Sequence, residues 1–201
     1  MNQLSVSGSR RLTKGEIARA EILAAAARML REVGYAEMSL RNLASQVNMM
    51  AGSLYYHFAS KDLLVTEVMR IGVEAVETAV REGLSGQTEL SPEAKLIVAV
   101  RIHLDTMLKK SDFVSSHIRC YPFVPAGVRE QLRDVRRSYD RLWLDMCRGF
   151  LGPSASHDDV RYLRHALIGA LNGTLEWFNP ERDSVRAFTA QIEAMLRNRE
   201  R

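Results

Sequence analysis

Five side chains that can form hydrogen bonds lie close together between residues 53 and 61, around two apolar anchors. The anchors, Leu54 and Phe58, are four residues apart, so they share one face of a helix and would dock it on a core. The polar residues around them are Ser53, Tyr55, Tyr56, His57 and Lys61. Their hydroxyl, imidazole and ammonium groups suit the recognition of a molecule outside the protein.

Two short helices and a tight turn would hold these side chains in place. Ser39 can cap the first helix, because its hydroxyl can accept a hydrogen bond from an amide of the first turn. Apolar residues then repeat at helical spacing on one face: Leu40, Leu43, Ala44 and Val47. Asn48 follows, and asparagine tolerates the left-handed backbone that such turns often need. Two short helices with a polar, exposed second helix are the layout of a helix-turn-helix DNA reader.

Longer helices are predicted on both sides of this pair. The first covers residues 14–33, because apolar residues recur along one stripe, a capping box starts at Thr13, and Gly34 can end the helix. The other begins after Ser60 and runs to about residue 83. It is long enough to connect the helix-turn-helix to the rest of the chain.

Turn-rich breaks divide the remaining sequence into further helices. The breaks are residues 83–92, 120–127 and 152–156. The helices predicted between and after them are 92–109, about 127–150, 158–178 and 184–198. No alternating pattern is long enough for a strand, so the predicted fold class is all-α.

The basic charge is concentrated at the N-terminal end of the chain. Residues 1–61 carry eight basic and four acidic side chains, and this excess of four equals the formal net charge of the whole protein. A polyanion-binding surface confined to this third is the functional interpretation. A solvated charged face is the alternative.

Several classes of protein are disfavoured by what the sequence lacks. No apolar run approaches the about 18 residues of a membrane span, and the N-terminus has no secretory h-region, so we expect a cytoplasmic protein with no membrane partner. Cys120 and Cys147 lack the spacing of a disulfide framework or a metal site.

No nucleophile elbow, phosphate-binding loop or zinc-protease motif is present, so we expect no enzyme, no catalytic or metal-binding residues and no cofactor. A helical protein–protein adaptor, or less favourably an all-α enzyme, is the alternative to a DNA reader.

Residues 14–64 resemble the N-terminal domain of the TetR family of bacterial transcriptional regulators. The resemblance rests on Ala20, Ile22 and Leu23, on Gly34 and Tyr35, and on the stretches SLRNLASQV, GSLYYHF and SKDLL. Asn48 departs from the family pattern, which commonly has glycine in the turn. The resemblance implies a three-helix DNA-binding domain over residues 13–60, preceded by a disordered basic arm at 1–12. A larger helical domain over 61–201 would then sense a ligand and form the dimer.

The family motif also implies which residues contact DNA. The expected phosphate contacts are Ser39, Tyr56, His57 and Lys61, and the expected base-reading residues are Arg41, Ala51, Gly52, Ser53 and Tyr55. Arg41 has the fork that matches guanine, and the small residues allow close approach to base edges. Basic residues at the N-terminus, Arg10, Arg11 and Lys14, are candidates for an adjacent groove or phosphate. As alternatives, Arg41 would pair with Glu37, and Tyr55 would pack into the core.

The last two helices are candidates for a dimer interface. Residues 160–178 are apolar nearly all round, which predicts a buried helix, and Gly169 and Gly173 would let another helix approach closely. The predicted interface residues are Leu167, Gly169, Ala170, Gly173, Phe188 and Ile192. The resemblance implies a homodimer through these two helices, which a two-fold symmetric operator on double-stranded DNA requires. The alternative is that residues 160–178 form the central helix of one subunit.

The resemblance further implies a cavity for a small-molecule inducer in the second domain. Its candidate residues are His103, Met107, Phe113, His117, Tyr121, Tyr139, Trp143, Met146 and Trp177. Residues 170–183 resemble family members that respond to acyl-CoA thioesters, although Gly173 stands where those relatives often have a bulkier residue. The basic run Arg133, Arg136 and Arg137 would face a CoA phosphate or, as the alternative, form a solvated helix face. An aromatic or drug-like inducer, or a core without a cavity, is the alternative, and repression is the family default.

Overall fold

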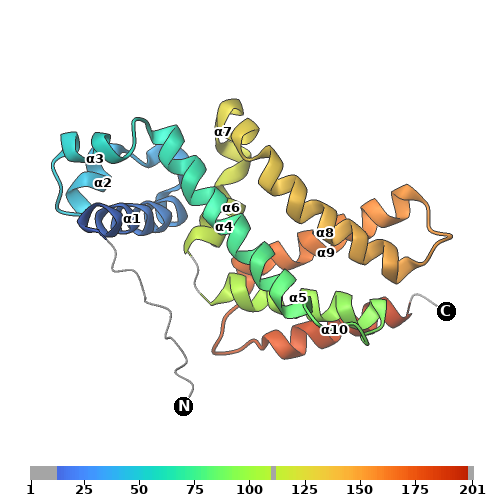
Figure 1. Ribbon diagram of the computed structural model, residues 1–201. Coiled ribbons are helices and arrows are strands. Elements are labelled where there is room, and N and C mark those ends of the chain that lie inside the picture. Colours follow the sequence, from blue (N-terminus) through green and yellow to red (C-terminus); the bar gives the residue numbers. More distant parts are fainter. Residues whose placement is uncertain (1–12, 110–111, 199–201) are drawn as a thin grey trace, which may run out of the picture.

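The computed structural model describes residues 13–109 and 112–198, and it is all-α with no strand in these ranges (Figure 1). The N-terminal half contains α1 Lys14–Glu37, α2 Leu40–Gln46, α3 Ala51–His57, α4 Lys61–Leu84 and α5 Pro92–Leu108. The C-terminal half contains α6 Asp112–Cys120, a short 3-10 turn at Tyr121–Phe123, α7 Ala126–Gln131, α8 Arg133–Leu151, α9 His157–Trp177 and α10 Val185–Arg197. The predicted fold class is confirmed. The predicted arm at residues 1–12 lies outside the described residues.

The helix starts and the tight turn form where the local sequence predicted them. The Thr13 capping box is present, and Ser39 and Ser60 each accept a hydrogen bond from an amide of the helix that they begin. Asn48 has a φ of 52°, the left-handed backbone expected of the turn between α2 and α3. Gly34, with a φ of 78°, interrupts α1 at the predicted end of the first helix, and a short helical turn follows it.

The helices α1 to α3, called the head below, share a core with parts of the chain far away in sequence. Leu54 and Phe58 anchor α3 in this core with 0% and 4% of their surface exposed. The same cluster of buried side chains includes Cys120 at the end of α6 and Leu132 at the start of α8. The head therefore rests directly on α4, α6 and the α7–α8 junction, and is not an isolated unit on a linker.

The helices α5 to α10, called the body below, contain a second core around Trp143, which is fully buried. The structure differs from the sequence prediction at two places in the body. Helix α6 was not predicted, and it packs against both α1 and α4. The single helix predicted at 127–150 is two helices, α7 and α8, that meet at Leu132. Leu132 is buried at this corner, where it joins the core of the head.

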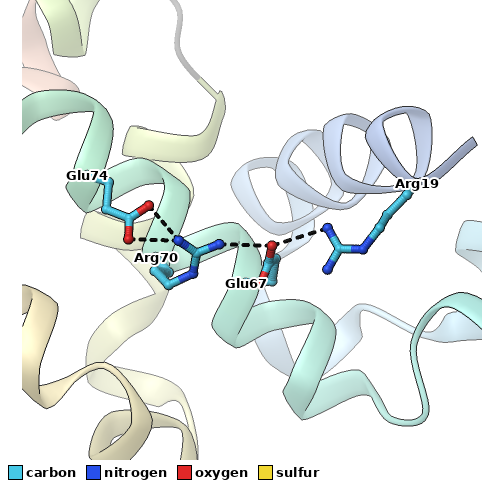
Figure 2. A network of polar contacts seen from close by, with 4 residues as sticks. All are labelled: Arg19, Glu67, Arg70 and Glu74. Carbon is cyan, nitrogen blue, oxygen red and sulfur yellow. Dashed lines mark hydrogen bonds and ion pairs between the residues drawn. The ribbon is translucent and has the colours of Figure 1, made fainter. Parts of the chain in front are cut away.

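Helix α4 runs from the head into the body, and a chain of ion pairs ties α1 to it (Figure 2). Glu67 Oε1 lies 3.2 Å from Arg19 Nη1 and 2.9 Å from Arg70 Nη2, and Arg70 Nη1 lies 2.6 Å from Glu74 Oε2. Arg19 also lies over the ring of Phe58, 4.7 Å from its centroid. These side chains are partly exposed, so the pairs add little stability but fix how α1 and the end of α3 sit on α4.

Candidate functional site

The outward surface of α3 is open to a partner. Tyr55 and Tyr56 expose 54% and 88% of their surface, so the alternative that Tyr55 packs into the core is wrong. The three residues before Leu54, predicted to read bases, are also exposed: Ala51, Gly52 and Ser53. Arg41 on α2 is exposed too, and the part of the chain that the structure describes contains no ion pair between it and Glu37. These predicted base-reading side chains are therefore free of the core.

The start of α4 is fixed beside the end of α1 by contacts around Tyr35. The Lys61 ammonium lies 4.2 Å from the centroid of the Tyr35 ring, and Lys61 Nζ donates a hydrogen bond of 3.4 Å to the carbonyl of Ala36. The Tyr35 hydroxyl donates to Asp62 Oδ1 at 2.5 Å. Burial, with this hydrogen bond to Asp62, raises the pKa of Tyr35 to about 12. The tyrosine therefore stays protonated and holds the charge of Lys61 close to the end of α3.

The other predicted phosphate contacts lie on or beside the two short helices. Ser39 caps α2, and the Tyr56 and His57 rings on α3 are nearly perpendicular, with their centroids 5.5 Å apart. Met50, which directly precedes α3, was not predicted to contact a partner, yet it is 81% exposed. Met50 is the N-cap residue of α3, and its side chain makes no capping hydrogen bond.

A small inner cavity lies in the body between α4, α5, α6, α8 and α9, with a volume of about 90 Å³. Four predicted pocket residues line it: His103, His117, Tyr139 and Trp143. Its apolar wall includes Val73, Val76 and Ile168. Sequence reasoning missed Gly72, Asp140, Arg164 and Asn172, which also line it. They lack the large aromatic side chains on which the prediction was based.

The structure places the other five predicted pocket residues elsewhere. Met107 is buried beside a separate recess, and Tyr121 lines the basic recess described below. Phe113 packs against the core of the head, and Met146 packs against the core of the body. Trp177 is 46% exposed on the outer side of α9. Large side chains fill a core as readily as they line a cavity, and helical periodicity does not separate the two.

A network of neutral polar groups lines part of the inner cavity. His103 Nδ1 lies 2.7 Å from the Tyr139 hydroxyl, and His103 Nε2 lies 3.3 Å from Asn172 Oδ1. Because the amide oxygen of Asn172 only accepts, Nε2 carries the hydrogen and Nδ1 accepts from Tyr139. Burial lowers the pKa of His103 to about 4, so the imidazole is neutral near pH 7.

An outer recess of about 550 Å³ adjoins the inner cavity, and the two share Arg136, Asp140 and Arg164. Five arginines line the recess, against the acids Glu130 and Asp140: Arg129, Arg133, Arg136, Arg137 and Arg164. Arg133 pairs with Glu130, and Arg164 pairs with Asp140. The recess is therefore strongly basic. It contains all three arginines of the basic run that was predicted to face a phosphate.

Arg136 connects the outer recess to His117 on α6. Its guanidinium lies 3.6 Å from the centroid of the Tyr121 ring and donates to His117 Nε2 at 2.9 Å. Burial, and then the charge of Arg136, lowers the pKa of His117 to about 3. His117 is therefore neutral near pH 7 and accepts through Nε2, so Nδ1 carries the hydrogen.

The two buried histidines predict a loss of stability in acid. Their folded pKa values, about 4 and about 3, lie below the about 6.5 of an unfolded histidine. Between these pKa values the unfolded chain binds more protons than the folded protein, so folding stability falls as the pH is lowered. We expect the free energy of unfolding to fall by about 2 kcal/mol per histidine between about pH 7.5 and about pH 5. Urea unfolding of the wild type and of His103→Leu at both pH values measures this. The variant should lose less stability than the wild type, while exposed His165→Gln should behave like the wild type. Equal losses in the wild type and in His103→Leu would contradict the assignment.

One face of α9 is open in the single chain, so the alternative that residues 160–178 form the central core helix of one subunit is wrong. The prediction that a second subunit covers this face stays a prediction. Of the predicted interface residues, Gly169 and Ala170 are exposed, and Gly173 and Phe188 are partly exposed. Leu167 and Ile192 are buried in the core of the body, but they also border a groove of about 540 Å³ between α9 and α10. Apolar side chains that remain exposed on this face are Tyr162, Trp177 and Met195.

Within residues 13–109 and 112–198, none of the helices has the length and apolar content that crossing a membrane requires. The same residues contain no group of three or more histidine, cysteine, aspartate or glutamate side chains that could hold a metal ion.

Two family models match the chain. The model of bacterial regulatory proteins of the tetR family matches residues 22–68, and the model of a tetracyclin repressor-like C-terminal domain matches residues 89–198. The first match contains the helix-turn-helix, and the second contains α5 to α10 in full.

Relatives are found among characterised repressors and solved structures. The HTH-type transcriptional repressor KstR2 of Mycobacterium tuberculosis is 42% identical over 52 residues, which are 26% of this chain and 26% of KstR2. The matched stretch thus spans about a quarter of that relative's length. The HTH-type transcriptional repressor Rv1474c of the same organism is 29% identical over 168 residues, 74% of this chain and 88% of the relative. The structure of AibR in complex with isovaleryl coenzyme A and operator DNA has a TM-score of 0.77 at 19% identity, covering 89% of this chain and 97% of that one. At this identity the likeness to AibR shows the fold alone.

Proposed function

Because the chain belongs to the TetR family of bacterial transcriptional regulators, we propose that it is a repressor that binds a pseudo-palindromic operator as a homodimer and leaves it when a small molecule binds the body. The exposed polar surface of α3, held by the buried anchors Leu54 and Phe58, is the observation that carries this proposal. A helix fixed on one side and polar on the other can enter the major groove. Such a repressor would need no catalysis, and it would act on DNA in the cytoplasm.

The proposed contacts divide into those that position the head and those that read sequence. Ser39, Tyr56, His57 and Lys61 would bind phosphates, because they combine a helix start, neutral donors and one positive charge. Base edges would be read by Arg41, Ala51, Gly52, Ser53 and Tyr55. The exposure of Tyr55 and of the start of α3 supports this division.

The proposed dimer forms through α9 and α10 of each subunit. An open face with exposed Gly169 and Ala170 beside an apolar groove supports this choice, because two helices can approach closely where side chains are small. An isologous contact across a two-fold axis would set the two heads at the spacing of the operator half-sites.

The proposed ligand is an acyl-CoA thioester. A strongly basic recess beside a mostly apolar cavity supports it, because such a ligand joins phosphates to an acyl group. AibR, which shares the fold, has been solved with isovaleryl coenzyme A and operator DNA. Occupation of the recess and cavity would act on α4 and α6, which contact the head.

Selection of genomic DNA fragments by the purified protein, at a fixed salt concentration, tests the proposed function. We expect a pseudo-palindromic site whose half-sites lie one or more helical turns apart. Addition of acyl-CoA thioesters should then release the protein from that site. Binding that is indifferent to sequence and lost on adding salt would argue against a sequence-specific regulator.

Substitutions at Lys61 and Tyr55 should separate the two kinds of DNA contact. Lys61→Ala should weaken binding to all sequences alike and lower the slope of log K against log salt by about one, since one phosphate contact is lost. Tyr55→Ala should weaken operator binding by about 1–3 kcal/mol and leave the slope unchanged, because it removes a base contact.

Titration of operator and scrambled DNA at several salt concentrations measures both effects. Arg101→Ala, which removes an exposed charge from α5, is the matched control and should change neither. Unchanged operator affinity in both variants would rule out this surface.

A further inference from the structure

The basic recess holds more positive charge than its own acids can neutralise. Arg133 and Arg164 have carboxylate partners, but Arg129, Arg136 and Arg137 form no ion pair within residues 13–109 and 112–198. Arg129 donates instead to the carbonyl of Val124, and Arg136 to His117. Three such arginines around one recess favour a ligand with several negative charges, such as the phosphates of a coenzyme A thioester.

His117 lines the inner cavity and contacts Arg136, which lines both the cavity and the recess, and it has a hydrogen-bond donor that the protein leaves unused. Only 9% of its surface is exposed. Nε2 accepts from Arg136, so the hydrogen is on Nδ1, and Nδ1 is buried with no hydrogen-bond partner in the described part of the chain. A buried donor without an acceptor costs free energy, which a ligand can recover by supplying an oxygen.

We propose that Nδ1–H of His117 donates a hydrogen bond to the thioester carbonyl oxygen of the ligand, and that the inner cavity admits only a short acyl group. This inference rests on the acyl-CoA ligand proposed above. The order of groups in the protein matches the order in such a ligand: arginines for the phosphates, His117 for the carbonyl, and Val73, Val76 and Ile168 for the acyl chain. His117 is thus a specificity residue, because it distinguishes a thioester from a molecule without the carbonyl.

The size of the inner cavity sets the limit on the acyl group. Its volume is about 90 Å³. Pockets for drug-sized ligands measure about 300–1,000 Å³. Tyr139, Trp143 and the fully buried Leu171 and Val100 belong to the core around it, so lengthening the cavity would require repacking. A chain of a few carbons fits this space, and a long fatty-acyl chain does not.

Comparison of a thioester with its thioether tests the role of His117 without any substitution. Butyryl-CoA and S-butyl-CoA differ only in the carbonyl, and we expect the full-length wild-type protein to bind the thioester about tenfold more tightly in titration calorimetry. In His117→Phe, which keeps a ring but has no donor, the ratio of the two affinities should fall to about one. His165→Phe, at an exposed position on α9, is the matched control and should keep the wild-type ratio.

The outcomes separate this inference from the proposed function. Equal affinity of the wild type for the thioester and the thioether would overturn the role of His117 and leave the CoA ligand standing. Tighter binding of palmitoyl-CoA than of butyryl-CoA would overturn the limit to short acyl groups. If the wild type bound its operator but none of butyryl-CoA, palmitoyl-CoA and free CoA, the ligand class would fail and this inference with it. If the wild-type protein bound no specific operator at all, the proposed function itself would be wrong.

Discussion

Replacement of Ala170 by glutamate is expected to turn the proposed dimer into a monomer and to lower operator affinity by about 100-fold or more. Ala170 is exposed on α9 and borders the apolar groove between α9 and α10. In the proposed isologous interface each copy of this residue would be covered by the other subunit, so the substitution buries an unpaired charge in each half of the interface. An unpaired buried charge costs several kcal/mol, and each head would then bind its half-site alone.

Sedimentation velocity gives the mass of the variant, and titration of operator DNA gives its affinity. Ala75→Glu is the matched control, because it places the same charge at an exposed alanine in the middle of α4. This control should remain dimeric and keep the wild-type affinity. The Ala170→Glu variant should keep the wild-type helix content, since its side chain meets no core of its own subunit. A variant that stays dimeric would contradict the proposed interface and favour another surface.

The parts of the fold that the sequence predicts are those set by neighbouring residues. Ser39, Ser60 and Thr13 cap helices through hydrogen bonds three residues ahead, and Asn48 needs only its own backbone angle to make the turn. The anchors of α3 were predicted because Leu54 and the residue four positions later share a helix face. The positions of α2, α3 and the turn between them could therefore be predicted closely, since they depend on short-range features. The DNA contacts assigned to their residues stay a proposal.

The cavity and the α6 contacts depend on residues far apart, and for that reason they escaped prediction. His103 meets Asn172 across 69 residues of sequence, and Arg136 meets His117 across 19. Nothing in the sequence around Asn172 distinguishes it from a polar residue on a helix surface. Helix α6 is only nine residues long, and its role comes from packing against α1 and α4 rather than from its own periodicity. For α9 the sequence left two readings open, a dimer interface and a central core helix, because an apolar pattern looks the same whether its own subunit or a second copy covers it.

Introduction of valine at Gly72 is expected to destabilise the protein by about 3 kcal/mol and to lower its melting temperature by about 10 °C. Gly72 lies on α4 where α6 crosses it most closely. A β-carbon at this position would lie 2.3 Å from the carbonyl oxygen of Phe113 and 2.7 Å from its carbonyl carbon. Both atoms belong to the backbone, so no side-chain rotation relieves the clash, and α6 must move away from α4. Gly72 also lines the inner cavity, so the same shift would disturb the ligand site.

Thermal and urea unfolding of Gly72→Val measure this cost, and Gly149→Ala on α8 provides a control of the opposite sign. A β-carbon at Gly149 would meet only Pro92 Cβ at 3.6 Å, an ordinary contact. Alanine there should therefore stabilise the protein by up to about 1 kcal/mol through helix propensity. If Gly72→Val were as stable as the wild type, α4 and α6 would not be in close contact. The head would then need another route to respond to the ligand, because α6 is the element that touches α1, α4 and, through His117, the cavity.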